Sequence, residues 1–396
     1  MLPNNWKKGT IEDIAKVASG GTPSRGNDLY WGGDIPWVTT SEVRFGIISD
    51  TEQKITSKGL KHSSAKIFPK GTILIAMYGQ GKTRGQVAKL AIEASTNQAC
   101  AALQLYTGYD VDYYYQFLAS QYENIRDLSN SGGQQNLSAG IIKNIHVPIP
   151  PLQEQQKIAK ILSTWDQAIT TTENLIKTSK QQKKALMQQL LTSKKRLTNP
   201  ETGKAFERNW QSSAFGNIFK ERVETGREDL PLLSITSNDG VVHQESTGRK
   251  NTSNEDKSKY RRICINDIGY NTMRMWQGRS SLSDKEGIVS PAYTIVTPSD
   301  AVCPIFASYL FKLPQLVHMF YRHSQGLVSD TWNLKFNHFK KIHWRLPQKP
   351  EQQKIASILT ATDKEIKVLE AKISYLQKEK KALMQQLLTG KRRITL

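Results

Sequence analysis

Two stretches of the chain carry apolar residues at alternating steps of four and three, the spacing of a coiled-coil seam. The first seam consists of Ile158, Leu162, Trp165, Ile169, Ile176, Leu186 and Leu190. The second consists of Ile355, Leu359, Ile366, Leu369, Ile373, Leu376, Leu383 and Leu387. Prolines precede both stretches, and a proline can open a helix but not continue one. The pattern predicts two helices of about 40 residues, each spanning roughly 60 Å. Matching seams favour helices that pack on each other over helices that are each embedded in a separate domain.

The two stretches are also copies of one element. EQQKIAKIL at 154–162 returns as EQQKIASIL at 351–359, and KKALMQQLLTSKKRL at 183–197 returns as KKALMQQLLTGKRRI at 380–394, both at an offset of 197 residues. Weaker echoes link Trp6 with Trp210, and Asn136 with Asn333. An internal repeat at this scale predicts two structural copies. The predicted order is a globular domain (1–150), a helix (151–197), a second globular domain (198–349) and a second helix (350–396).

Both globular segments are predicted to be α+β. Short apolar runs rich in β-branched or aromatic residues predict strands: GTILIAMY, ACAALQLY, RICINDIGY and AYTIVTP. Late in each segment, YYYQFLASQYENIRDLS and PIFASYLFKLPQLVHMFYRHS are typical of helices, the second interrupted at Pro314. The expected fold class is therefore α+β, with two globular domains and two long helices.

The charge balance narrows the choice of partners. Among 396 residues, 55 Lys and Arg against 35 Asp and Glu give a net charge of +20. This excess favours a polyanion, with nucleic acid as the leading candidate. Three widely spaced cysteines imply no disulfide framework and indicate a reducing compartment. No apolar run approaches the length of a membrane span, so we expect a cytoplasmic protein that does not enter membranes.

The stretch ILIAMYGQGKTRG at 73–85 raises the alternative of a nucleotide-binding P-loop. Such a loop cradles phosphates where a strand passes into a helix, with Lys at the phosphates and Ser or Thr at magnesium. Lys82 and Thr83 fit the permissive spacing, but Gly85 falls where the helix should be established. The counterpart GYNTMRMWQGRSSL keeps Gly278 and has Arg279 in place of lysine. We therefore interpret both stretches as a strand followed by a polar loop.

Polar and basic side chains in these matched loops suit DNA contacts. Lys and Arg can contact phosphates or guanine, Gln can pair with adenine, and Thr can meet a thymine methyl group. The candidates from the loops are Gln80, Lys82, Thr83, Arg84, Gln277 and Arg279. Each residue alone is better explained as a solvated surface side chain, and only their grouping in a basic, repeated protein favours DNA.

Catalytic patterns are weak in this chain. It has no HExxH or paired-cysteine zinc pattern, no GxSxG elbow, and no N-P-P-[YF] run of an amino-methyltransferase. We therefore expect neither catalytic residues nor a metal site.

The doubled EQQKIA and KKALMQQLLTGKRR elements, each after a divergent globular domain, closely resemble the specificity subunit of type I restriction-modification systems. SGGTPSRGND, YWGGDIPWVTTSEV and the loop after GTILIAMYG resemble parts of that family's target recognition domains. The second domain retains no GGTP and only part of the glycine loop. The resemblance adds further candidate DNA-binding residues: Thr22, Ser24, Arg25, Thr39, Thr40, Gln134, Gln135, Ser237, Asn238, Arg274 and Trp276.

The resemblance implies a non-catalytic subunit that binds double-stranded DNA. Two recognition domains would read the two halves of an asymmetric bipartite site, and an antiparallel helix pair would hold them at a fixed spacing. It implies two DNA adenine methyltransferase subunits that use S-adenosylmethionine, and restriction subunits that use ATP and Mg²⁺, so the cofactors belong to the partners. The rival interpretations are a basic coiled-coil scaffold without sequence readout, and the P-loop NTPase.

Overall fold

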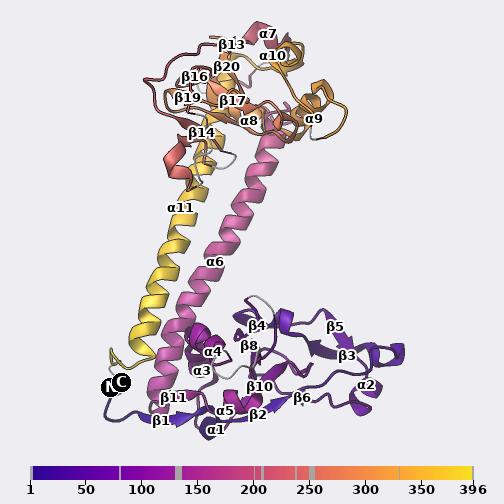
Figure 1. Ribbon diagram of the computed structural model, residues 1–396, viewed down its shortest axis with the longest axis vertical. Coiled ribbons are helices and arrows are strands. Elements are labelled where there is room, and N and C mark those ends of the chain that lie inside the picture. The colour runs from indigo at the N-terminus through magenta and orange to yellow at the C-terminus, as the bar shows by residue number, and fades with distance from the viewer. Residues whose placement is uncertain are drawn as a thin grey trace. The chain divides into compact units, whose positions relative to one another are not determined.

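The computed structural model describes residues 3–79, 82–129, 136–199, 201–206, 209–236, 239–248, 255–329 and 331–394. The chain divides into two compact units: unit 1 comprises residues 1–173 and 371–396, and unit 2 comprises residues 174–370. Each unit contains a body of mixed helices and strands together with about half of each long helix (Figure 1). The α+β fold class with two long helices is confirmed.

The body of unit 1 is built on antiparallel and mixed sheets. A five-stranded sheet has the order β2 (Ala15–Ser19), β10 (Cys100–Leu105), β7 (Ile73–Ala76), β8 (Val87–Leu90), β4 (Gly46–Ile48). A four-stranded sheet has the order β5 (Gln53–Ile55), β3 (Trp31–Val38), β9 (Ala94–Thr96), β6 (Ile67–Phe68). The outer ribbon pairs β1 (Lys7–Thr10) with β11 (His146–Ile149). The helices of this body are α1 (Ile11–Ile14), α2 (Ser57–Lys61), α3 (Val111–Ser120), α4 (Tyr122–Asp127) and α5 (Ala139–Lys143).

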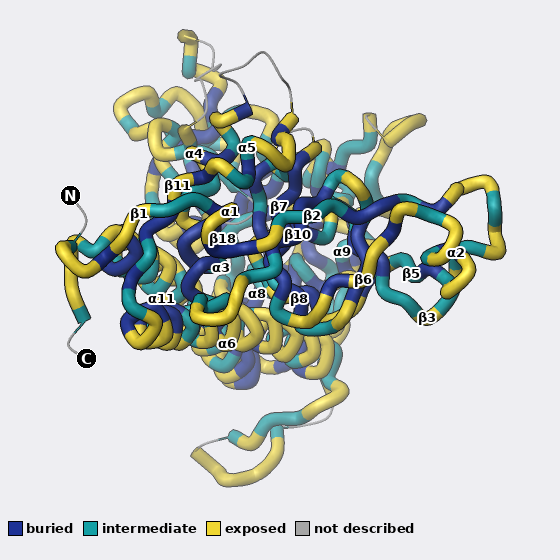
Figure 2. The backbone as a smooth tube through the Cα atoms, turned by 90° about the horizontal axis from the view of Figure 1, so that it is seen from below, coloured by how far each residue is buried: buried dark blue, intermediate teal, exposed yellow. Residues whose placement is uncertain are grey.

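The core of unit 1 joins this body to the long helices. Strands β7 and β10 are largely buried, and β2 beside them is mostly half-buried (Figure 2). Their side chains share one apolar cluster with α3 and with residues of both long helices, including Ile158, Leu162 and Leu387. The heptad seam is therefore part of the domain core as well as of the helix pair.

Unit 2 repeats the plan with different side chains. Its main sheet has the order β13 (Phe219–Arg222), β20 (Tyr293–Pro298), β17 (Ile268–Asn271), β18 (Ser280–Leu282), which matches β2, β10, β7, β8. Further pairs are β12 (Gln211–Ala214) with β21 (His343–Leu346), β14 (Leu233–Ile235) with β15 (Val241–His243), and β16 (Arg261–Ile263) with β19 (Gly287–Val289). The helices are α7 (Phe215–Ile218), α8 (Pro304–Leu310), α9 (Pro314–His323) and α10 (Phe336–Phe339).

The long helices are α6 (Leu152–Leu190) and α11 (Lys349–Leu387). They end before the predicted segments do, because Ser193 and Gly390 adopt left-handed φ angles of 62° and 71°. Every seam residue named above is buried or half-buried. In unit 1, Asp166 pairs with Lys380 at 2.6 Å, and in unit 2, Lys183 pairs with Asp363 at 2.5 Å. In each unit the early turns of one helix meet the late turns of the other, so the antiparallel coiled coil is confirmed.

A buried polar contact closes each unit, and we call these contacts joint 1 and joint 2. In joint 1, Glu154 accepts hydrogen bonds from Trp6 Nε1 at 2.9 Å and from Arg393 Nε at 2.8 Å. In joint 2, Glu351 accepts from Trp210 Nε1 at 3.2 Å and from Arg196 Nη2 at 3.3 Å. The two glutamates are the first residues of the repeated EQQ motif, which is therefore a structural element.

The first glutamine of each EQQ motif forms hydrogen bonds with backbone groups and not with side chains. Gln155 donates from Nε2 to the carbonyl of Pro150, and its Oε1 accepts from the amide of Asp110. Gln352 donates to the carbonyl of Pro347 and accepts from the amide of Cys303. The repeated motif thus fixes where each long helix leaves its domain.

No helix among the described residues has both the length and the apolar character needed to cross a membrane.

Candidate nucleic-acid interface

The GQGKT stretch lies between two neighbouring antiparallel strands. Ile73 pairs with Lys89 and Ile75 with Val87, so β7 and β8 form a hairpin. A P-loop requires a helix after the glycine-rich turn, with its N-terminal amides aimed at phosphate. Here the residues after Arg84 enter strand β8. The geometry agrees with a strand followed by a polar loop and opposes the P-loop alternative.

We call residues 77–79 and 82–86 hairpin 1. Lys82 is exposed, and Thr83 and Arg84 are half-buried. Tyr122 Oη donates a hydrogen bond of 2.6 Å to the Lys82 carbonyl. The Phe45 ring packs edge-on against Tyr122, with the ring centres 5.1 Å apart. Helix α4, which contains Tyr122, therefore holds the described part of hairpin 1 in place.

We call residues 272–279 hairpin 2, the turn between β17 and β18. Gln277 and Arg279 are exposed, whereas Arg274 and Trp276 are half-buried. Trp276 Nε1 donates to the carbonyl of Met273 at 3.1 Å. Gly278 has a φ angle of 72°, which a residue with a side chain rarely adopts. This glycine allows the tight turn that presents Arg279.

A half-buried lysine fixes the base of hairpin 2. Lys312 Nζ donates to the carbonyls of Gly278 and Ser280 at 2.8 and 2.5 Å. Burial lowers the pKa of Lys312 to about 8. Sequence reasoning missed this residue, because nothing in the KLP stretch around Lys312 distinguishes it from a solvated lysine.

In both units a segment from later in the chain lies beside the hairpin and is hydrogen-bonded to it in the same way. The Leu137 amide donates to the Met77 carbonyl at 3.1 Å, and the Leu334 amide donates to the Thr272 carbonyl at 2.8 Å. These leucines follow the Asn136 and Asn333 anchors of the repeat. The structure therefore places each hairpin beside the segment that begins at the Asn136 or Asn333 anchor of the repeat.

Other candidate residues of unit 1 have partners within the protein. Thr22 donates to Gln98 at 2.5 Å, and Arg25 lies 3.9 Å over the Trp31 ring while donating to Gln53. Thr39 forms a capping box with Glu42 at the start of a short 3₁₀ turn that includes Thr40. Ser24 is exposed. DNA contact by these residues stays a prediction, as it does for the seventeen candidates as a group.

Five of the candidates lie outside the described residues: Gln80, Gln134, Gln135, Ser237 and Asn238.

The GGTP glycines of unit 1 are required by close backbone crossings. A Cβ atom on Gly20 would lie 1.9 Å from the Thr96 carbonyl oxygen, and one on Gly21 would lie 2.2 Å from Ser64 Oγ. The Gly21 amide donates to the Thr96 carbonyl at 2.8 Å, and Trp37 Nε1 donates to the Gly21 carbonyl at 2.9 Å. The motif thus joins the two sheets of unit 1.

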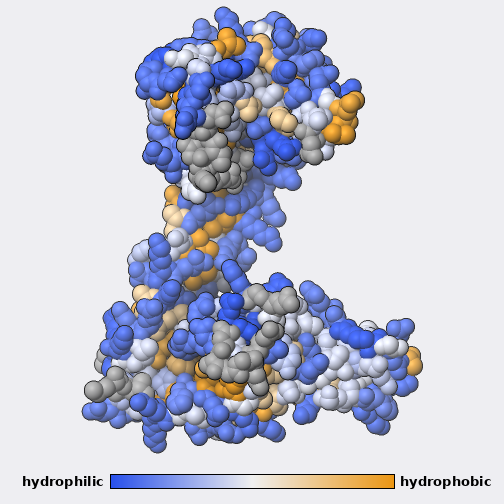
Figure 3. Space-filling model, viewed as in Figure 1, coloured by the Kyte–Doolittle hydropathy of each residue, from blue (hydrophilic) through white to orange (hydrophobic). Residues whose placement is uncertain are grey.

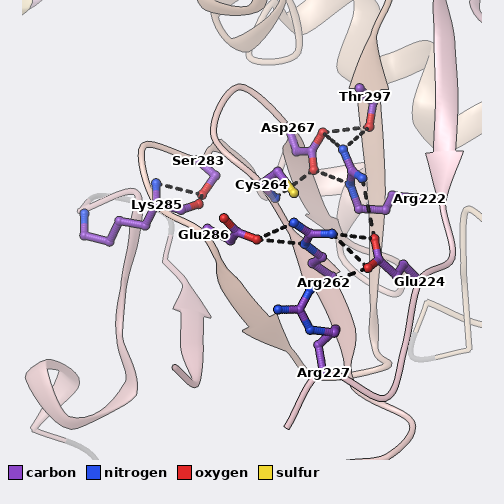
Figure 4. A network of polar contacts seen from close by, with 10 residues as sticks. All are labelled: Arg222, Glu224, Arg227, Arg262, Cys264, Asp267, Ser283, Lys285, Glu286 and Thr297. Atoms are coloured by element: carbon purple, nitrogen blue, oxygen red, sulfur yellow. Dashed lines mark hydrogen bonds and ion pairs between the residues drawn. The ribbon is translucent and has the colours of Figure 1, made fainter. Parts of the chain in front are cut away.

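In unit 2 the corresponding residues are Glu224 and Thr225, and Glu224 belongs to a network of charged side chains (Figure 4). Arg222 Nε donates to Asp267 at 2.7 Å, and this hydrogen bond raises the pKa of Arg222. Arg262 pairs with Glu224 at 2.8 Å and with Glu286 at 2.5 Å. Each of these arginines already faces a carboxylate, so the network organises the domain and does not add free positive charge.

Among the described residues, no group of three or more His, Cys, Asp or Glu side chains is arranged to hold a metal ion.

Comparison with known proteins identifies the family. The model of the type I restriction modification DNA specificity domain matches residues 3–181 and 207–378. The chain therefore belongs to this family, and it contains two copies of the domain. The predicted resemblance is confirmed.

Individual relatives agree. The MjaIX specificity subunit of Methanocaldococcus jannaschii is 32% identical over 246 residues, an alignment that covers 57% of this chain and 54% of that protein. The MjaVIII specificity subunit of the same organism is 26% identical over 423 positions, covering 99% and 94%. The crystal structure of the type I S subunit from M. genitalium has a similar fold, with a TM-score of 0.59, 16% identity, and coverage of 100% and 99%.

Proposed function

We propose that this chain reads an asymmetric, bipartite site in double-stranded DNA, with one unit on each half-site. The observation that supports this most is the pair of equivalent hairpins with different residues, Lys82, Thr83 and Arg84 in one and Gln277 and Arg279 in the other. Equivalent scaffolds place these side chains alike, while their different chemistry selects different bases. The net charge of +20 supplies the nonspecific attraction to phosphate.

We further propose that the chain acts through partners. It would direct two DNA adenine methyltransferase subunits, which use S-adenosylmethionine, and restriction subunits that use ATP and Mg²⁺. Family membership and the two copies of the domain support this assignment. The chain itself would perform no catalytic step.

The experiment has two parts. The chain is purified with the products of its neighbouring genes, and methylated adenines are mapped by long-read sequencing in cells with and without its gene. The expected result is an asymmetric split motif that disappears with the gene. An active methyltransferase partner whose methylation does not depend on this gene would overturn the proposal and favour the scaffold, which predicts salt-dependent binding without sequence preference.

Substitutions in hairpin 1 test whether each unit reads one half-site. Replacing Lys82, Thr83 and Arg84 together by Ala should weaken binding at one half-site at least tenfold, because each base or phosphate contact is worth about 1–3 kcal/mol. Binding is measured on duplexes in which either half-site is scrambled. The matched control replaces Gln277 and Arg279, which should affect the other half-site. Equal losses on both halves would show only nonspecific phosphate contact.

A further inference from the structure

A pair of apolar side chains is displayed at a turn between α9 and α10. Leu327 is fully exposed and Val328 is 58% exposed. Single exposed apolar residues are ordinary on protein surfaces, but two adjacent ones at the end of a turn contribute little to folding. Figure 3 shows hydrophobic surface at the edge of unit 2 beside α9. The exposure of these two apolar side chains therefore suggests a role other than packing in the domain core.

The described residues at the base of the turn are hydrogen-bonded to one another. Gln325 and Asn333 exchange two backbone hydrogen bonds of 2.8 Å. The Thr331 amide donates to the Val328 carbonyl at 2.9 Å. Gly326 has a φ angle of 138°, and a Cβ atom there would lie 2.6 Å from the Thr331 carbonyl oxygen. These contacts hold the two ends of the turn together, and Leu327 and Val328 lie exposed between them.

An aromatic ladder ties this turn to hairpin 2. The Trp332 ring packs edge-on against Tyr321 of α9 at 4.8 Å and against Trp276 of hairpin 2 at 5.2 Å. The Leu334 amide also donates to the Thr272 carbonyl at 2.8 Å. The segment that follows the apolar pair therefore packs against hairpin 2, which contains Gln277 and Arg279.

The segments around the pair carry positive charge. Arg279 lies in hairpin 2, Arg322 lies in the last turn of α9, and Lys335 precedes α10; these three outnumber Asp330, the one acidic residue in the sequence of the turn, which lies outside the described residues. An apolar tip among cations matches a base stack flanked by phosphates better than an apolar protein face. Apolar side chains on DNA-binding proteins can insert between base pairs and partly unstack them.

We propose that Leu327 and Val328 form a wedge that inserts between adjacent base pairs of the half-site read by unit 2. This inference rests on the proposed function. The wedge would favour steps that unstack easily, such as TA and CA, so it would add sequence preference at a position that no polar side chain reads. The preference would come from deformability of the duplex and not from hydrogen bonds to bases.

The test uses the chain assembled with its methyltransferase subunits. Duplexes carry 2-aminopurine at successive positions of the half-site read by unit 2, whose fluorescence rises when the base is unstacked. The wild-type complex should raise the signal at one step, and the double variant Leu327→Ser, Val328→Ser should leave it at the level of free duplex. Affinity should fall by less than about tenfold, since the lost contact is offset by the unstacking that is no longer needed. The matched control is Ile265→Ser, which removes a 61% exposed isoleucine elsewhere in unit 2.

Three results would overturn the wedge. Specific binding by the wild-type complex with no rise at any step would remove the wedge and leave the proposed function intact. A rise that persists in the double variant would assign the unstacking to other residues. Loss of the methyltransferase subunits from the double variant on size-exclusion chromatography would make the turn a protein contact. A wild-type complex without sequence-specific binding would instead contradict the proposed function itself.

Discussion

The two units share their joints but not their recognition surfaces. Joint 1 and joint 2 use the same three residue types, and the seam pairs Asp166 with Lys380 and Lys183 with Asp363 are copies of each other. The residues that follow β2 in unit 1 and β13 in unit 2 differ. In unit 1, Gly20 and Gly21 lie against β9, whereas in unit 2, Glu224 belongs to a charged network.

The difference separates two kinds of constraint. The joints must fit a helix end to a domain, and both units solve that packing problem with one set of contacts. The strands and hairpins only need to support a surface, so glycine crossings and ion pairs can replace each other on the same sheet order. The repeat is therefore strongest in sequence where the helices leave their domains.

We expect the largest loss of stability from a substitution at Gly20, where the backbone of unit 1 crosses Thr96 closely. Gly20→Ala would place a Cβ atom 1.9 Å from the Thr96 carbonyl oxygen and should cost unit 1 about 3 kcal/mol or more. The corresponding change in unit 2, Glu224→Ala, removes a half-exposed ion-pair partner and should cost about 1 kcal/mol. Hydrogen exchange of peptides from β2 and β13 in the full chain measures both costs. Equal costs would contradict the difference drawn between the units.

The joints should respond unequally. Glu154→Ala leaves Trp6 and Arg393 without their acceptor and should destabilise unit 1 by about 3 kcal/mol. Glu351→Ala should cost unit 2 about 2 kcal/mol, because its hydrogen bonds are longer and burial raises the pKa of Glu351. Urea unfolding followed by tryptophan fluorescence tests this, with Glu→Gln at each site as the control. A larger loss in the Glu351 variant would show that bond length is a poor guide here.

The lysine that holds hairpin 2 predicts a pH dependence for the stability of unit 2. Lys312 has a pKa lowered by burial to about 8, so the unfolded chain binds the proton more tightly than unit 2 does. Its contribution to the stability of unit 2 should therefore rise by roughly 2 kcal/mol as the pH goes from about 8 to the ordinary lysine pKa near 10.4. Hydrogen exchange of β17 and β18 across this window measures the slope. Lys312→Met should abolish it, and an unchanged slope would assign it to another group.

The smallest effect tests the symmetry of the seam. Asp166→Asn and Asp363→Asn each weaken one partly exposed ion pair with a lysine of the facing helix, and each should cost about 1 kcal/mol. Hydrogen exchange of the flanking helix peptides compares the two variants. A clear difference between them would show that Gln116 and Tyr309, which also donate to these carboxylates, contribute unequally.

Periodic features were predictable from the sequence. The heptad pattern located α6 and α11, and its seam positions are buried or half-buried as a coiled coil requires. Lys183 and Lys380 fall on the same steps, and each has an aspartate opposite. The apolar runs located β7, β10, β17 and β20, because a short run rich in β-branched or aromatic residues is a local property of a strand.

Contacts between distant segments were not predictable. Trp6 and Glu154 are 148 residues apart, and no local pattern links them. Arg25 is a plausible base reader in sequence, yet its hydrogen bond to Gln53, 28 residues away, depends on the pairing of β3 with β5. The capping box of Thr39 and Glu42 could have been found, since a threonine three residues before a glutamate is its known signature.

The division of the chain into units has a consequence for synthesis. Unit 2 is one continuous segment, residues 174–370, whereas unit 1 needs residues 371–396 to complete its core around Ile158 and Leu162. A growing chain emerges from its N-terminus, and domains fold as their segments become available. The core of unit 1 must therefore wait, with that apolar helix face uncovered, until Leu387 and Arg393 have left the ribosome. Residues made after the whole of unit 2 complete the unit whose synthesis began earlier.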